Sequence, residues 1–165
     1  MKIRLFTRKD STQIQSVARE SWRYAYEGLI PQQTQVDFLL SVYNEDALMK
    51  GLSTSVLFVA EEKGEVIGFV HFSLINIKKE IELGALYILP RFHRQGIGTA
   101  LLKAMFDYFK GIRKITVSVV MQNDAAIDFY HSKGFKQVGE MNDSIYGFSI
   151  PTIVMEWGSN TRPNV

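Results

Sequence analysis

The chain has 165 residues, 46% of them hydrophobic and 22% charged, with a formal net charge of +2 and no cysteine. This length and balance suit one soluble globular domain with a single sizeable core. The small net charge argues against a nucleic-acid or membrane-surface binder. The lack of cysteine excludes disulfides, thiolate metal sites and a cysteine acyl-enzyme. We expect a cytoplasmic protein, because the first residues lack the apolar core of a secretory signal and no apolar run approaches the roughly 20 residues that span a bilayer.

The first third of the chain predicts a short strand followed by helices. Residues 3–6 are a strand candidate, and apolar residues at helical spacing predict a helix over residues 11–26, for which Asp10, Ser11 and Thr12 offer an N-cap. Pro31 is placed to begin a second helix, and residues 45–52 predict a third. The pattern then changes to that of strands, since residues 56–61 and 66–74 flank a Lys63-Gly64 turn and predict a hairpin.

The second half alternates strands and helices. Strands are predicted over residues 81–89, 115–120, 135–140 and 150–157, and helices over residues 96–109 and 123–132. This order predicts an α/β protein with a mixed sheet and helices on both of its faces. We expect residues 1–157 to form a single domain and the polar residues 158–165 to form a disordered tail.

One turn carries most of the functional information. In residues 86–102, LYILPRFHRQGIGTALL, a strand ends, a basic loop follows and two glycines open a helix. Gly96 and Gly98 have no Cβ, so a ligand can approach the backbone closely. The N–H groups of a first helical turn lack intrahelical partners and, with the helix dipole, favour an anion. Arg94 adds positive charge and Thr99 a hydroxyl. Taken alone, the segment also fits an ordinary surface turn, and neither a Walker nor a Rossmann pattern is present.

Two motifs nevertheless resemble those of a known family. The turn is similar to motif A of the GNAT acetyltransferases, Q/R-x-x-G-x-G/A after a strand ending in L-Y-V/I-x-P, with His93 standing where that family usually has Gln or Arg. The segment from Asn123 to Tyr130, followed by Gly134-Phe135, resembles the family's N-x-x-A-x-x-x-Y-x-x-x-G-F. Residues 21–31 also resemble a segment that is common in small GNAT enzymes.

This resemblance implies the GNAT acyl-CoA N-acyltransferase fold. Its twisted mixed sheet has six to seven strands, and two parallel strands, here residues 81–89 and 115–120, splay apart to admit the pantetheine arm. Gly84 fits a bulge that would open the first of these strands, although it also fits a small residue under a helix. The implied cofactor is acetyl-CoA, and the residues expected to contact it are Leu86, Tyr87, Ile88, Arg94, Gln95, Gly96, Ile97, Gly98, Thr99, Asn123, Ala126 and Tyr130.

The resemblance also implies catalytic groups. Tyr130 matches the tyrosine that reaches the CoA sulfur in many family members, although a core aromatic would also fit. Glu82 stands in an otherwise apolar strand, where burial would make its carboxylate a better base, acting directly or through water. A solvated carboxylate is the alternative reading of Glu82. Because the chain has no cysteine, direct attack by the amine in a ternary complex is the simplest route.

The resemblance implies that the acceptor is a primary amine of a small molecule or peptide, and the residues do not identify it further. Trp22 and Tyr26 lie four residues apart on one helix face and, with Glu27, would suit a cationic amine, although aromatics at this spacing also fit a core. No metal is expected, since the three histidines lack metal-like spacing. A homodimer is common for such folds. The rival functions are a non-catalytic acyl-CoA-binding regulatory module and a structural nucleotide-binding domain.

Overall fold

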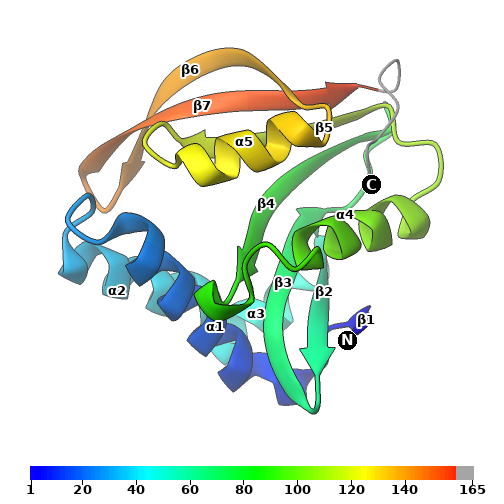
Figure 1. The fold of residues 1–165 in the computed structure, drawn as a ribbon, viewed down its shortest axis with the longest axis horizontal. Coiled ribbons are helices and arrows are strands. Elements are labelled where there is room, and N and C mark those ends of the chain that lie inside the picture. The colour runs from blue at the N-terminus through cyan, green and yellow to red at the C-terminus, as the bar shows by residue number, and fades with distance from the viewer. Residues whose placement is uncertain (159–165) are drawn as a thin grey trace.

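Residues 1–158 are described by the computed structural model, and they contain seven strands and five α-helices in the predicted order (Figure 1). The helices are α1 (Ser11–Tyr26), α2 (Gln32–Tyr43), α3 (Glu45–Gly51), α4 (Ile97–Tyr108) and α5 (Asp124–Ser132). The strands are β1 (Lys2–Leu5), β2 (Ser55–Glu62), β3 (Glu65–Ser73), β4 (Glu80–Ile88), β5 (Lys114–Val120), β6 (Lys136–Ile145) and β7 (Phe148–Gly158). Gly158, expected in the polar tail, is instead the last residue of β7, and the rest of that tail lies outside the described residues.

The seven strands form one mixed sheet in the order β1-β2-β3-β4-β5-β7-β6. Neighbouring strands are antiparallel except β4 and β5, which are parallel. The centre of the sheet is covered on both faces, because the consecutive residues 66–70 of β3 are all buried, whereas a strand with one wet face would alternate. α1 packs against β3 and β4, and α4 packs against β2 and β3. The predicted α/β architecture is confirmed.

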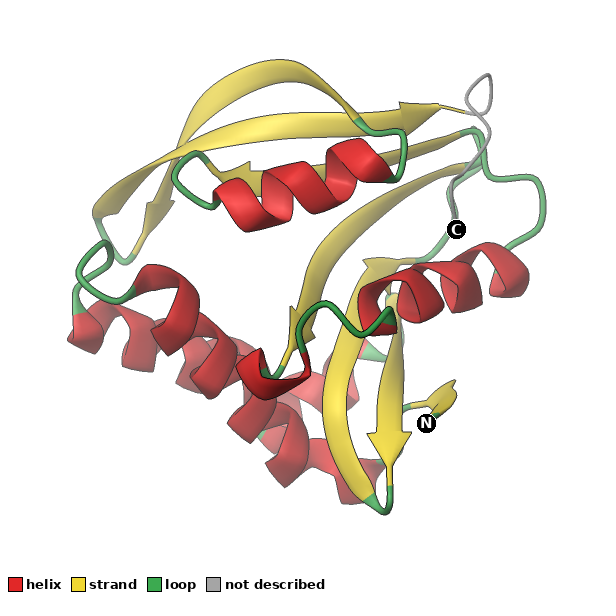
Figure 2. Cartoon of the chain, viewed as in Figure 1, coloured by secondary structure: helices red, strands yellow, loops and turns green. Residues whose placement is uncertain are grey.

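The feature that positions the site is a break in the pairing of β4 with β5. The two strands pair only from Glu80, opposite Lys114, to Leu83, opposite Val117, and then diverge. Gly84 lies at that point as an extra residue, since Leu83 faces Phe72 of β3 while Ala85 faces the preceding residue, His71. A bulge bends its strand, so the bulge predicted at Gly84 is confirmed. Figure 2 shows β4 and β5 spreading from their paired ends, with α4 and α5 flanking the space in this view.

Local details differ from the sequence-based expectation at two places. Asp10 does not cap α1, because its carboxylate accepts hydrogen bonds of 2.7 and 2.8 Å from the Arg4 guanidinium and others from Thr7. The hairpin of β6 and β7 is longer than predicted, and it turns at Tyr146 and Gly147. Among residues 1–158, no helix is long and apolar enough to cross a membrane.

Candidate active site

A cleft of about 410 Å³ opens where β4 and β5 separate. Most of the residues predicted from the sequence line it, namely Trp22, Tyr26, Leu86, Tyr87, Ile88, Arg94, Gly96, Ile97, Gly98, Thr99, Asn123, Ala126 and Tyr130. Three predicted residues, Glu27, Glu82 and Gln95, do not line it. The structure therefore brings together residues from α1, β4, the turn before α4, and α5, which are far apart in the sequence.

One end of the cleft is the N-terminus of α4. Gly96 is the N-cap residue with φ +79°, in the left-handed region, and a Cβ added there would meet nothing within 4 Å. The first intrahelical bond runs from the Ala100 N–H to the Gly96 carbonyl at 3.0 Å, and no side chain caps the turn. The N–H groups of Ile97, Gly98 and Thr99 therefore lack intrahelical acceptors. This open, uncapped turn fits an anion such as a pyrophosphate.

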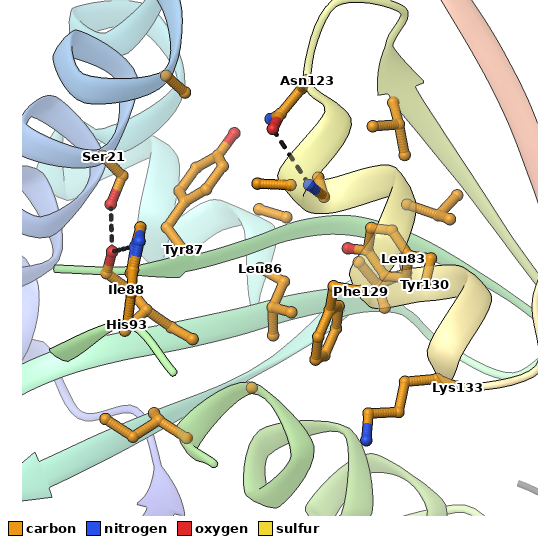
Figure 3. A pocket seen from close by; sticks show the side chains of 18 of the residues that line it. Ser21, Leu83, Leu86, Tyr87, Ile88, His93, Asn123, Phe129, Tyr130 and Lys133 are labelled. Carbon is orange, nitrogen blue, oxygen red and sulfur yellow. Dashed lines mark hydrogen bonds between the residues drawn. The ribbon is translucent and has the colours of Figure 1, made fainter. Parts of the chain in front are cut away.

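Positive charge lines the same cleft. Arg94 is exposed and borders the turn before α4. Lys133, just after α5, also lines the cleft, and its ammonium lies 5.7 Å from the centre of the Phe129 ring (Figure 3). Lys133 was not predicted from the sequence, where the only indication of its role is its position between Tyr130 and the Gly134-Phe135 pair of the second motif. Gln95 instead turns its amide to the Arg91 carbonyl, 3.2 Å away.

His93 ties the end of β4 to α1. Its Nε2 lies 3.0 Å from the Ile88 carbonyl oxygen, and because a carbonyl only accepts, this nitrogen carries the hydrogen. The Ser21 hydroxyl donates to the same oxygen at 3.1 Å (Figure 3). The His93 ring also packs edge-on against Tyr24, 5.4 Å between centroids. The Ile88 carbonyl is thus already occupied, which leaves the backbone of Leu86 and its neighbours for a ligand.

Tyr130 lies in the cleft wall with 5% of its surface exposed. Its ring packs against Phe129 and Phe135, with centroids 5.3 and 5.2 Å away. Burial raises the pKa of Tyr130 far above that of a free phenol, and nearby Tyr87 and Tyr26 add to the shift. Tyr130 is therefore protonated at neutral pH. Within residues 1–158 its hydroxyl makes no side-chain hydrogen bond, so its proton is available to a bound molecule.

Asn123 joins the α5 end of the cleft to α1. Its side-chain oxygen accepts a hydrogen bond from the Ala126 N–H at 3.2 Å and so caps α5. The Asn123 side chain also interacts with the hydroxyl of Tyr26, which partly offsets the burial that raises the pKa of Tyr26. Trp22 packs edge-on against Tyr26 at 5.1 Å, and both are buried. These two aromatics are thus core residues that also line the cleft.

The structure does not support the burial expected for Glu82. This residue is exposed, and it lies opposite Thr116 where β4 and β5 are still paired, before the bulge opens the strands. The expectation of a buried, more basic carboxylate is wrong for that reason. Glu27 is also exposed and follows the last residue of α1, where it borders a separate groove between α1 and α2. No group of three or more His, Asp or Glu side chains in residues 1–158 is arranged to hold a metal ion.

The uncapped N-terminus of α4, the stretch of β4 that has no β5 partner and the buried phenol of Tyr130 meet in one cleft, an arrangement that suits a ligand carrying both phosphate and amide groups. The chain belongs to the Acetyltransferase (GNAT) family, whose model matches residues 14–135. It is accordingly an acetyl-CoA-dependent N-acetyltransferase, as predicted from its motifs.

Relatives extend the similarity along the chain. The uncharacterized N-acetyltransferase YuaI of Bacillus subtilis is 36% identical over 157 residues, which cover 90% of this chain and 88% of the relative. A spermidine N(1)-acetyltransferase of Thermoplasma acidophilum is 29% identical, over 82% of this chain and 88% of its own length. The crystal structure of PaiA N-acetyltransferase from Thermoplasma acidophilum in complex with coenzyme A superimposes with a TM-score of 0.81 at 25% identity, covering 96% of this chain and 99% of that one.

Proposed function

We propose that the protein transfers the acetyl group of acetyl-CoA directly to a primary amine of a small molecule or peptide, within a ternary complex. The observation that carries this proposal is the early end of the β4–β5 pairing after Leu83, opposite Val117. Beyond it, the backbone of β4 faces the cleft on the side where the next strand would otherwise bind. A buried backbone edge requires partners, and an amide-containing arm such as pantetheine supplies them.

The residues present fit this cofactor along the whole cleft. The first turn of α4 and Arg94 would hold the pyrophosphate, and the backbone near Leu86 would pair with the pantetheine amides. Tyr130 would then face the sulfur. The thioester supplies an activated acetyl carbonyl for the amine to attack.

The transfer forms a nitrogen–carbon bond and breaks the carbon–sulfur bond. An alkyl amine with a pKa of about 10.4 arrives protonated and has to lose a proton before it attacks. The leaving thiolate resembles a cysteine thiolate, with a pKa of about 8.5, and gains from protonation. We assign that proton to the Tyr130 hydroxyl, which solvent then restores. The amine passes two protons to water, one before it attacks and one as the amide forms, and Glu82, exposed outside the cleft, could take them only through solvent.

The acceptor would approach the end of the cleft bounded by Trp22 and Tyr26, whose aromatic faces suit an amine. Polyamines, amino-acid analogues, aminoglycosides and protein N-termini are the candidate acceptors. The relative from Thermoplasma acidophilum named for spermidine makes a polyamine the first one to test. A homodimer is a further expectation, which light scattering would measure.

The decisive experiment is an amine-library screen with acetyl-CoA, read by thiol release and by the mass of the acetylated product. Amine-dependent thiol release with a product 42 Da heavier is expected. CoA binding without turnover of any amine would favour the non-catalytic regulatory module. Binding of dinucleotides in preference to CoA would favour the structural nucleotide-binding domain.

A further inference from the structure

His71 of β3 lies beside the bulge that opens the cleft. Its partner on β4 is Ala85, and the register of the two strands shifts next to this pair, which makes Gly84 the extra residue. A Cβ built on Gly84 would lie 3.6 Å from Nδ1 of the His71 ring. Gly84 also lines the cleft, where β4 and β5 separate. Because glycine has no side chain, this position does not cover the ring nitrogen on the side of the cleft.

Two hydrogen bonds fix which nitrogen of the His71 ring carries the hydrogen. Ser55 of β2 donates its hydroxyl hydrogen to the carbonyl of Gly51, the last residue of α3, at 2.6 Å. The same Ser55 oxygen lies 2.7 Å from Nε2 of His71. A hydroxyl has only one hydrogen, so Nε2 is the donor to Ser55. Nδ1 of the neutral ring therefore carries a lone pair, and it is the nitrogen beside Gly84.

The lone pair of Nδ1 is open to a bound molecule. Within residues 1–158 no donor forms a hydrogen bond with it. The fully buried side-chain nitrogens and oxygens that lack a partner in this part of the chain are the indole nitrogens of Trp22 and Trp157. Nδ1 is not one of them, so it is reached by solvent as well as being without a partner. A nitrogen in this state can accept a proton.

His71 shares a face of the sheet with Glu82. Phe72 and Leu83 are opposite each other in the β3–β4 pairing, and both are buried. His71 precedes the first of them and Glu82 precedes the second. Because successive side chains of a strand point to opposite faces, the two polar residues lie on the other face from this buried pair. Of the two, His71 is the one next to the opening of the cleft, since Glu82 lies before the bulge.

Burial keeps the ring neutral. The charged groups on the same face or on elements next to His71 are Lys50 near the end of α3, Glu80 and Glu82 of β4, Lys114 of β5 and Glu156 of β7. Lys114 forms ion pairs with Glu80 and Glu156, and within residues 1–158 none of these groups pairs with His71. Burial disfavours the charged imidazole and lowers the pKa of His71 from its ordinary value of 6.5. The ring is therefore an uncharged base at neutral pH.

The proposed path of the cofactor leads to this nitrogen. β4 runs from the bulge at Gly84 past Leu86 to the turn before α4. A molecule with its pyrophosphate at the N-terminus of α4 and its amides on the backbone near Leu86 therefore extends toward Gly84. The cleft closes there, because β4 and β5 are paired from Leu83 back to Glu80. The thioester, where the amine attacks, would lie near the bulge.

We propose that Nδ1 of His71 accepts the proton that the acceptor nitrogen releases as the amide forms, directly or through one water molecule. The inference rests on the proposed function and gives one of the two amine protons an acceptor in the protein. The first proton is lost to solvent before the attack. As the nitrogen–carbon bond forms, the nitrogen becomes positively charged and acidic, and its proton passes to Nδ1. The carbon–sulfur bond then breaks, Tyr130 protonates the sulfur, and the imidazolium returns its proton to solvent. Ser55 is a positioning residue, because it holds the tautomer that leaves the Nδ1 lone pair open.

The test is His71→Gln, because a glutamine amide can donate to Ser55 but is not a base. With an amine found in the screen, kcat at pH 7 should fall by about 10²–10⁴-fold, the usual contribution of one general base. Melting temperature and CoA affinity should stay close to those of the wild type. The ratio of the wild-type kcat to that of the variant should be largest above about pH 6.5 and approach one as the pH falls through the lowered pKa of His71. The amine titrates alike in both assays and cancels in this ratio.

Two further variants sharpen the test. Gly84→Ala adds a methyl group 3.6 Å from Nδ1, an ordinary contact distance, and should lower kcat with the same pH dependence because it covers the nitrogen. His131→Gln makes the same substitution as His71→Gln at an exposed histidine of α5 that does not line the cleft. This control should leave kcat unchanged at every pH.

Nitrogen NMR of the imidazole rings needs no turnover and should show His71 as the Nε2–H tautomer at pH 7. An Nδ1–H tautomer would overturn the proposal. Wild-type kcat in His71→Gln would also overturn it while leaving the proposed function standing. A loss of kcat by the same factor at every pH is the result of a structural role and would count equally against the proposal. If the wild type acetylates no amine, the proposed function itself fails, and this inference fails with it.

Discussion

Two substitutions at Gly96 separate the effect of backbone strain on cofactor binding from the effect of charge. Its φ of +79° is rarely adopted by residues with a Cβ, and a Cβ there would meet nothing within 4 Å. The Cβ that Gly96→Ala and Gly96→Asp both add therefore meets no neighbour, and both variants carry the cost of a left-handed residue, about 1–2 kcal/mol. For a chain of this length each kcal/mol lowers the melting temperature by about 2–4 °C.

Charge acts only in Gly96→Asp. Two unit charges about 4 Å apart near a protein surface repel by roughly 4 kcal/mol. At about 1.4 kcal/mol per factor of ten in affinity, this corresponds to nearly three decades. We therefore expect Gly96→Asp to bind CoA about 10²–10³-fold more weakly than Gly96→Ala, with similar melting temperatures for the two. The difference should shrink in high salt, because added ions screen exposed charges.

Isothermal titration calorimetry with CoA, at low and high salt, measures the predicted difference directly. Circular dichroism and thermal melts first establish that both variants are folded. Equal CoA affinity for Gly96→Ala and Gly96→Asp at low salt would show that no phosphate lies at the N-terminus of α4. The reasoning from the open helix turn would then be refuted, whatever the enzyme's activity.

Three further changes test other parts of the structure. Tyr130→Phe should lower kcat by about 10²–10⁴-fold in a thiol-release assay. The melting temperature and the CoA affinity should stay unchanged, because the lost hydroxyl makes no side-chain hydrogen bond within residues 1–158. Wild-type turnover in this variant would remove Tyr130 from the mechanism. Gly98→Ala places a Cβ 3.0 Å from the Phe129 ring and should lower the free energy of unfolding in urea by about 1–3 kcal/mol; an unchanged value would contradict the tight packing of α4 against this ring. The Arg4 guanidinium holds the pKa of Asp10 below its usual range, so the ion pair stabilises the folded state. This contribution to the free energy of unfolding is present above about pH 4 and is lost as the pH falls through the lowered pKa. Asp10→Asn should thus be less stable than wild type at pH 7, and the gap in urea unfolding should close below pH 4; a constant gap would contradict the assignment.

Parts of the site could be predicted because each of them depends on a short local pattern in the sequence. The turn before α4 depends on Gly96 and on a first helical turn, both of which are local features. The bulge at Gly84 was also predictable, because a glycine inside an apolar strand weakens that strand and often marks a bulge. The cap of α5 is local as well, since the Asn123 side chain accepts from the Ala126 N–H three residues further on.

Features that depend on distant contacts could not be predicted in this way. The Asp10 side chain does not cap α1, because its carboxylate binds the guanidinium of Arg4 on β1. Glu82 lies on the same strand as the cleft-lining residues Leu86 to Ile88. Only the position of the bulge along β4 decides which residues of this strand reach the cleft. Tyr43 comes from α2, and no pattern in the sequence predicts that its ring packs edge-on against that of Tyr87, 6.2 Å between centroids. Such pairings arise from tertiary packing, which local patterns do not record.

The interrupted pairing of β4 and β5 has a consequence for the protein before it meets its cofactor. A free strand edge is a template on which another chain can add, and proteins generally protect such edges. In this sheet the exposed edge lies in the interior, beyond the bulge, where a bound pantetheine arm would take the place of a strand. Ligand at 100 times its dissociation constant adds about 2.7 kcal/mol to stability. We therefore expect the shelf life and solubility of the purified enzyme to follow the CoA concentration, with amide exchange in the second half of β4 slowing as CoA is added.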